Sequence, residues 1–269
     1  MKKTVLLLVV GLWLSLCLAT SPEGTPVSYK QAFSITDQSD DHMDIRFTLP
    51  DYELENVNVG DQVFHRIILP DAGTTLESGL PELPTVSISL AIPRQGSTHV
   101  SLMGSESEQL SAFNAYPVQQ GQELESPKSF VYNADYYTQG NLYPQNVVQI
   151  SEPYILRDFR LVTIQINPFI YNPLTDELSV NQTIDLRIVF SPEPGANEMT
   201  GQYSSYSQAF TNIYEAAILN FDDFRYQMYS STPPRYLLIY GNNTDPNFLN
   251  AINDFVLWKR QKGADVDVA

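Results

Sequence analysis

The 269-residue sequence contains one cysteine, Cys17, which lies in its N-terminal apolar segment. Without a second cysteine no disulfide can form within the chain, and the residues after it offer no thiol nucleophile and no thiolate metal ligand. Histidine is also scarce, and His42, His65 and His99 are scattered, so we expect surface positions or satisfied strand positions for them. No HExxH, GxSxG, P-loop or GxGxxG pattern occurs. The sequence therefore predicts no catalytic residue, no metal site and no cofactor in these residues.

Basic residues are few. Lysine and arginine number 15 against 31 acidic residues, which gives a formal net charge of −16, and loss of Lys2 and Lys3 would make the chain more acidic still. An acidic surface argues against nucleic acid and anionic membranes as partners. This balance suits a soluble exported protein.

The N-terminus has the pattern of a secretory signal peptide. Lys2 and Lys3 precede an apolar run at 4–18, which is too short to cross a bilayer comfortably, and small residues follow it. We expect residues 1–19 to be removed by cleavage after Ala19. A retained membrane anchor is the disfavoured alternative, because no second apolar segment appears downstream. The prediction is a secreted protein with no membrane contact after signal removal.

Between about residues 44 and 190 there is no long run of apolar residues at helical spacing. Apolar residues there instead recur at every second position, as in a β-strand. In VSISLAIP (86–93), apolar residues alternate with Ser87, Ser89 and Ala91, and in ELSVNQTIDLRIVF (177–190) only Gln182 interrupts one apolar face. Further strands are expected at 44–49, 63–69, 99–103 and 161–166, separated by Gly, Pro, Asn and Asp turns. Many short strands of this kind predict a mainly β fold, an antiparallel sandwich or barrel-like domain.

After residue 190 the composition and the hydrophobic pattern change. Residues 191–208 are polar and rich in Gly, Pro and Ser, as in a linker, and 209–224 have the spacing of a short helix. After Pro233-Pro234 comes RYLLIYG, a compact strand, and then a helix with Asp245 as its N-cap and Gly263 at its end. ADVDVA begins a second strand, expected to lie parallel to the first. One strand–helix unit cannot bury both faces of a parallel sheet, so we expect an α/β domain that continues past Ala269.

Two weaker patterns allow a functional and a structural interpretation. DQSDDHMD (37–44) groups carboxylates that could hold calcium, but it lacks EF-hand spacing, and a solvated acidic turn is favoured. The 16 tyrosines could form a carbohydrate-stacking face, although tyrosine is also common in strands and at sandwich rims, which is the favoured interpretation.

Three stretches together resemble gingipain-type proteins of peptidase family C25. GLPELPTVSISLAIP (79–93) and LRDFRLVTIQINPFIYNPLTDELSV (156–180) are similar to segments of their propeptides, and RYLLIYG…FVLWKRQKGADVDV (235–268) is similar to the start of their catalytic domain. The resemblance implies a β-sandwich propeptide that keeps a secreted cysteine endopeptidase latent and assists its folding. The partner would be the chain's own downstream caspase-like peptidase domain, whose catalytic Cys and His have no counterpart in these residues.

The resemblance gives expected boundaries: a signal peptide at 1–19, a propeptide sandwich at 26–192, a linker with a short helix at 193–233, and the first part of the peptidase domain at 234–269. The alternative is a secreted β-sandwich module for binding or adhesion, attached to a non-peptidase or catalytically dead α/β domain. The sequence downstream of Ala269 distinguishes the two.

The resemblance also implies two sites. Activation needs cleavage in the segment FDDFRYQMYSSTPPRYLL (221–238), where Arg225 is better placed than Arg235, which adjoins the first catalytic strand. Latency could use a basic side chain inserted into the specificity pocket, and Arg157 and Arg160 are the candidates, because an arginine pairs bidentately with a carboxylate. The structural alternative is that these two arginines pair with local acids such as Glu152 or Asp158.

Overall fold

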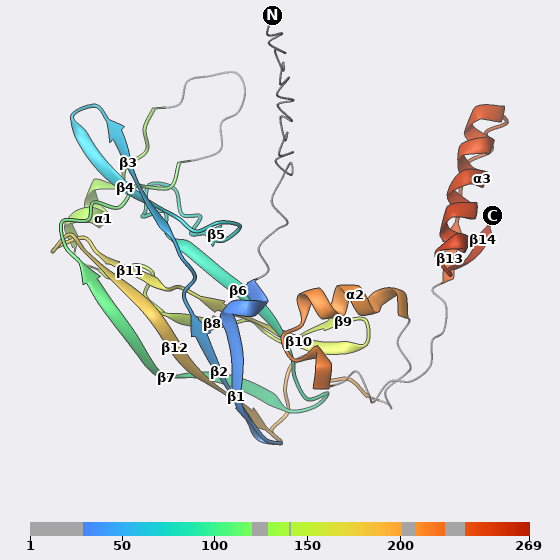
Figure 1. Cartoon of the computed structure of the whole chain (residues 1–269), viewed down its shortest axis with the longest axis horizontal. Coiled ribbons are helices and arrows are strands. Elements are labelled where there is room, and N and C mark those ends of the chain that lie inside the picture. Colours follow the sequence, from blue (N-terminus) through green and yellow to red (C-terminus); the bar gives the residue numbers. More distant parts are fainter. Residues whose placement is uncertain (1–28, 120–128, 140, 201–207, 224–234) are drawn as a thin grey trace, which may run out of the picture.

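The computed structural model describes residues 29–119, 129–139, 141–200, 208–223 and 235–269. Its main body consists of antiparallel sheets, which confirms the predicted mainly β fold (Figure 1). The first sheet is built around the long strand β12, which pairs with β7 along one edge, while β2 and β11 share the other edge and β1 pairs with β2. The strands of this sheet are β1 (Phe33–Gln38), β2 (His42–Thr48), β7 (Ser97–Leu110), β11 (Phe169–Asn172) and β12 (Glu177–Ser191).

The second sheet is built around β10. β6 pairs with one edge of β10, and the short strands β8 and β9 pair with successive parts of the other edge, while β5 extends the sheet beyond β6. The strands of this sheet are β5 (Gly73–Thr74), β6 (Pro84–Ala91), β8 (Val148–Ile150), β9 (Tyr154–Leu156) and β10 (Phe159–Ile166).

The apolar faces of the two sheets pack together into a large hydrophobic core. The alternation read from the sequence is confirmed, because Val86 and Leu90 of β6 and Ile184 and Ile188 of β12 are all at most 1% exposed. Each such aliphatic side chain contributes roughly 1.5–3 kcal/mol relative to an exposed position. The interruption at Gln182 coincides with a register shift between β12 and β7, a bulge that bends the long strand.

A β-hairpin and two short helical elements lie outside the two sheets. β3 (Glu53–Val59) and β4 (Gln62–Ile68) form a hairpin whose turn contains Gly60 at φ 59°, in the left-handed region that glycine adopts without steric cost. The strand expected at 63–69 is therefore confirmed, while β3 escaped prediction because most of its residues are polar and exposed. The short helix α1 (Ala134–Gln139) and the 3-10 turn η1 (Tyr29–Ala32) were not predicted either.

The expected short helix after the sandwich is α2 (Gln208–Ala217), followed by the 3-10 turn η2 (Phe221–Asp223). It covers the outer face of the second sheet and forms a separate hydrophobic cluster there, which includes Tyr214, Ile218 and Phe221. Ala91, predicted on the wetter face of its strand, is only 3% exposed as a result. The predicted linker interval thus contains a segment that packs on the sandwich.

The C-terminal strand–helix–strand unit has the predicted form. β13 (Arg235–Leu238) pairs in parallel with β14 (Asp265–Val268), and α3 (Pro246–Gln261) connects them. The Asp245 side chain accepts a hydrogen bond from the Asn247 backbone N–H, and Gly263 follows the helix at φ 82°, as expected for its two ends. Among the residues that the structure describes, no helix combines the length and apolar character needed to span a bilayer.

Candidate functional site

The tip of the β9–β10 hairpin carries the first predicted plug residue. Arg157 and Asp158 form the two-residue turn between the strands, and Arg157 has φ 55°, a left-handed conformation that costs an L-residue about 1–2 kcal/mol. Its side chain is 54% exposed, lies 3.6 Å from the Asp158 carboxylate, and places its guanidinium carbon 4.3 Å from the centre of the Phe210 ring. A cationic group is therefore presented at the surface on a turn.

Contacts with helix α2 hold this turn in place. The Tyr214 hydroxyl donates a hydrogen bond of 2.7 Å to Oδ2 of Asp158, and the Tyr214 ring packs edge-on against Phe159 with centroids 4.8 Å apart. Burial raises the pKa of the Tyr214 hydroxyl, and the Asp158 carboxylate raises it further, so the phenol stays protonated and remains a donor. The conformation of the turn thus depends on a helix that follows it by about fifty residues in the sequence.

Arg160, the second predicted plug residue, occupies a different environment. It lies in β10 with only 1% of its surface exposed, and its guanidinium donates to the backbone oxygens of Pro93, Gly96 and Ala196 at 2.6–3.1 Å. The structure therefore does not bring the two arginines together on one surface. Arg160 binds backbone carbonyls rather than the local acids considered from the sequence. Of the two predicted arginines, only Arg157 is therefore free to enter a specificity pocket.

The backbone around Arg160 is closely packed. A Cβ built on Gly195 would lie 2.0 Å from the carbonyl oxygen of Gly96, so only glycine fits there. Oε1 of Glu198 accepts hydrogen bonds from the backbone N–H groups of Gly96 and Gly195, which lowers the pKa of its carboxyl group. Arg160 and Glu198 together hold the loop before β7 against the loop after β12.

The segment between α2 and the predicted cleavage region is attached to β6. The side-chain amide of Asn220, 3% exposed, accepts from the Ala91 backbone N–H and donates to the Ala91 carbonyl, both at 2.9 Å. The Leu219 N–H donates to the Ser89 carbonyl, and Nζ of Lys30 donates to the carbonyls of Glu215 and Ile218. The chain is thus fixed to the sandwich shortly before Arg225, which itself lies outside the described residues, as does Ala19.

A further exposed feature was missed in the sequence. The β3–β4 hairpin presents Leu54, Val63 and Ile68 to solvent at 49%, 47% and 38% exposure, whereas Phe64, near its turn, is buried against Tyr116 and other rings. These three apolar side chains are available for contact with a partner. The only sequence signal for it was the apolar content of 63–69, which predicted a strand but not which of its residues are exposed.

The acidic stretch at 37–44 forms the β1–β2 turn and its flanks. Oxygen and nitrogen atoms of Asp37, His42 and Asp44 lie within 4.8 Å of one another, but each already has protein partners. The Arg187 guanidinium donates two hydrogen bonds of 2.6 Å to Asp44, and the His42 ring contacts Asp41 at 2.8 Å and Asp37 at 3.2 Å. This arrangement is a hydrogen-bonded polar turn, and the preference for a solvated turn over a calcium site stays a prediction.

Comparison with known proteins identifies the family. The model of the Propeptide_C25 family matches residues 31–229, well over half of the chain. The chain belongs to the Propeptide_C25 family. The resemblance to gingipain-type propeptides is thereby confirmed, and the match extends through α2 to the region of Arg225.

Curated relatives of this Propeptide_C25 chain are gingipains of Porphyromonas gingivalis. Lys-gingipain is 28% identical over 248 residues, which cover 87% of this chain and 14% of the relative. Gingipain R2 is 25% identical over 228 residues, which cover 83% of this chain and 30% of the relative. The chain therefore spans a minor part of the length of the relatives it matches.

Two solved structures have the same fold as this Propeptide_C25 chain. The complex of the P. gingivalis RgpB pro- and mature domains contains a chain that superposes with a TM-score of 0.62 at 21% identity, covering 71% of this chain and 97% of that one. A structure on the zymogenic latency of gingipain K from the same organism superposes with a TM-score of 0.51 at 24% identity, covering 59% and 92%.

Proposed function

We propose that these residues are the N-terminal part of a secreted gingipain-like cysteine endopeptidase zymogen, in which the β-sandwich keeps the peptidase latent and assists its folding. The match to the Propeptide_C25 family over residues 31–229 carries this proposal. The likeness to a chain in the complex of the RgpB pro- and mature domains supports the choice of partner. In this proposal, residues 1–19 direct export, 26–192 form the latency domain, and 234–269 begin the peptidase domain.

Two exposed features, one on the β3–β4 hairpin and one on the sandwich, suit a contact with the peptidase. The β3–β4 hairpin offers apolar side chains, and the turn at Arg157 offers a cation on a short, anchored loop. If the specificity pocket of the peptidase is acidic, the Arg157 guanidinium pairs with its carboxylate once the loop is seated. Latency then combines steric cover of the cleft with occupation of the pocket.

Activation is proposed to occur by cleavage after Arg225. The contacts of Asn220 and Lys30 hold the chain to the sandwich just upstream of this residue, so a cut there leaves α2 on the propeptide and leaves β13 intact on the peptidase. N-terminal sequencing of the mature secreted enzyme tests this directly. A start upstream of residue 191 or within the strand at 236–240 contradicts it.

The latency proposal is tested by adding the isolated propeptide to the mature peptidase. We expect saturable inhibition that Arg157→Ala weakens at least tenfold, since truncating a buried charged plug costs about 2–5 kcal/mol and tenfold corresponds to about 1.4 kcal/mol. Arg46→Ala is the matched control, because Arg46 is also about half exposed (52%) but lies on the first sheet. Inhibition that is equally sensitive or insensitive to both changes refutes Arg157 as the plug, and absence of inhibition refutes latency.

The cysteine peptidase assignment has a separate test. A strand-end His and a strand-end Cys in the α/β sheet encoded after Ala269 support it, and their absence leaves a binding module attached to a non-peptidase or catalytically dead domain.

A further inference from the structure

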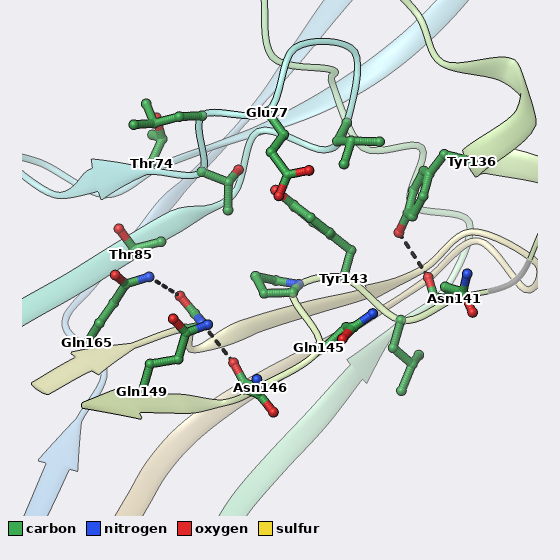
Figure 2. A pocket seen from close by; sticks show the side chains of 16 residues that line it. Thr74, Glu77, Thr85, Tyr136, Asn141, Tyr143, Gln145, Asn146, Gln149 and Gln165 are labelled. Carbon is green, nitrogen blue, oxygen red and sulfur yellow. Dashed lines mark hydrogen bonds between the residues drawn. The ribbon is translucent and has the colours of Figure 1, made fainter. Parts of the chain in front are cut away.

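A cavity of about 650 Å³ opens on the sandwich beside the end of β10 (Figure 2). Its lining comes from the segment that follows β5, from helix α1, from the loop leading into β8, and from the end of β10. Its volume is within the range of about 300–1,000 Å³ that is typical of small-ligand sites. Neither the latency proposal nor the cleavage proposal uses this cavity.

The lining is polar and almost uncharged. Side-chain amides are its commonest group, and it also contains threonines and tyrosines, whereas Glu77 is the one charged side chain among the described residues that line it. The amides are those of Asn141, Gln145, Asn146, Gln149, Gln165 and Asn167. Because none of the described residues that line the cavity is a lysine, arginine or histidine, a phosphate or carboxylate ligand would find no cation among them to pair with.

The inner amides are held in place by hydrogen bonds. Nε2 of Gln165 donates to Oδ1 of Asn167 at 3.1 Å, and Nδ2 of Asn167 donates to the Asn146 carbonyl at 2.7 Å. Asn167 is 1% exposed, so the floor of the cavity is rigid and satisfied. By contrast, the exposed side-chain amides of Gln145 and Gln149 make no hydrogen bond to any residue that the structure describes. Each offers a donor and an acceptor to a ligand.

Two tyrosine rings form one side of the cavity. Tyr136 and Tyr143 are half-buried with ring centroids 5.9 Å apart, and Figure 2 shows both lying toward the cavity. The Tyr136 hydroxyl donates to the Asn141 carbonyl at 2.9 Å, which fixes its ring. Burial raises the pKa of Tyr143, and the nearby Glu77 carboxylate raises it further, so its hydroxyl stays protonated. An amphipathic ring of this kind can contact the C–H face of a ligand while its hydroxyl is hydrogen-bonded.

We propose that this cavity binds a neutral saccharide, with Gln145 and Gln149 hydrogen-bonding its hydroxyl groups and Tyr143 contacting its apolar face. A sugar hydroxyl both donates and accepts, as a side-chain amide does, and a neutral sugar needs no charged partner. A peptide is the competing occupant. A peptide would be held through apolar side-chain pockets or a strand edge. Leu76 is one of the few apolar residues of the lining, and at 85% exposure it lies at the rim and encloses no such pocket.

The test uses the chain from residue 20 to 269 on an array of neutral mono-, di- and trisaccharides, followed by calorimetric titration of the strongest binder. We expect a Kd below about 1 mM. Gln149→Ala and Tyr143→Ala should each weaken binding at least fivefold, with unchanged circular dichroism. Gln261→Ala is the matched control, because Gln261 is also an exposed glutamine but lies in α3, and it should bind as the unaltered protein does.

Three outcomes overturn the proposal: no neutral saccharide binds in this range, a binder is found whose affinity is unaffected by both cavity variants, or a peptide panel binds at Gln149 and Tyr143 while the sugars do not. Inhibition of the peptidase can be measured on the same variants. Unchanged inhibition alongside lost sugar binding shows that the two sites are independent.

Discussion

The Arg160 side chain gives the sharpest prediction of stability. It makes four hydrogen bonds, two to Ala196 and one each to Pro93 and Gly96, from a guanidinium that is 1% exposed. Burial lowers the pKa of this group, and an arginine side chain stays charged in proteins. Arg160→Ala removes all four contacts and leaves a cavity at the junction of the two loops.

The magnitude follows from which carbonyls can be hydrated afterwards. A hydrogen bond to a charged group contributes roughly 1.5–3 kcal/mol, but the variant also avoids the cost of burying the charge. Pro93 and Ala196 are exposed residues whose part-buried carbonyls can regain water, whereas Gly96 is buried and keeps an unsatisfied oxygen, which costs about 1–3 kcal/mol. With the lost packing, we expect a total loss of about 2–4 kcal/mol, or roughly 4–16 °C in Tm.

Urea denaturation of the chain from residue 20 to 269, followed by far-UV circular dichroism, measures this loss in the free energy of unfolding. The free energy of unfolding of Arg160→Lys should lie between those of the wild type and Arg160→Ala, because an ammonium lacks the planar fork that reaches several carbonyls. Arg157→Ala is the control and should change the free energy of unfolding by no more than about 0.5 kcal/mol. Equal losses for Arg160→Ala and Arg157→Ala would refute the structural role assigned to Arg160.

Three further predictions follow from single contacts. Asn220→Ala should cost about 1–3 kcal/mol in urea denaturation, because a buried backbone N–H and carbonyl lose their partner; an unchanged midpoint contradicts the attachment of α2. The Arg187 guanidinium lowers the pKa of Asp44. The stability that this ion pair contributes is therefore present above the unfolded pKa of the carboxyl group and is lost as the pH falls through the lower folded pKa. Arg187→Gln should accordingly flatten the fall in the free energy of unfolding at acid pH. Asp41 and, less strongly, Asp37 raise the pKa of His42 above 6.5, so a two-dimensional NMR titration should show a midpoint above 6.5 that Asp41→Asn lowers, and a midpoint insensitive to that change refutes the pairing.

The local pattern of the sequence was sufficient for the strands that alternate cleanly. In β6 and β12 the side-chain period of two decides which residues are buried, because one face of each strand packs on the opposite sheet. The ends of α3 were also predictable, since Asp245 and Gly263 satisfy helix termini through contacts with their sequence neighbours. β3 was missed because its polar residues carry no alternation, and its pairing with β4 is set by the turn at Gly60.

The sites depended on the tertiary structure. Arg157 and Arg160 are three residues apart and look alike in the sequence, yet one is presented on a turn and the other is enclosed by two loops that are about a hundred residues apart. Nothing local distinguishes them, because burial of Arg160 depends on carbonyls that only the folded sheets bring together. The cavity at Gln149 arises in the same way, from segments after β5, around α1 and at the end of β10 that meet only when the second sheet has formed. The sequence alone determined the fold class and the family resemblance, since alternation, turns and motifs are properties of neighbouring residues, whereas the exposure of each polar side chain is decided by non-local packing.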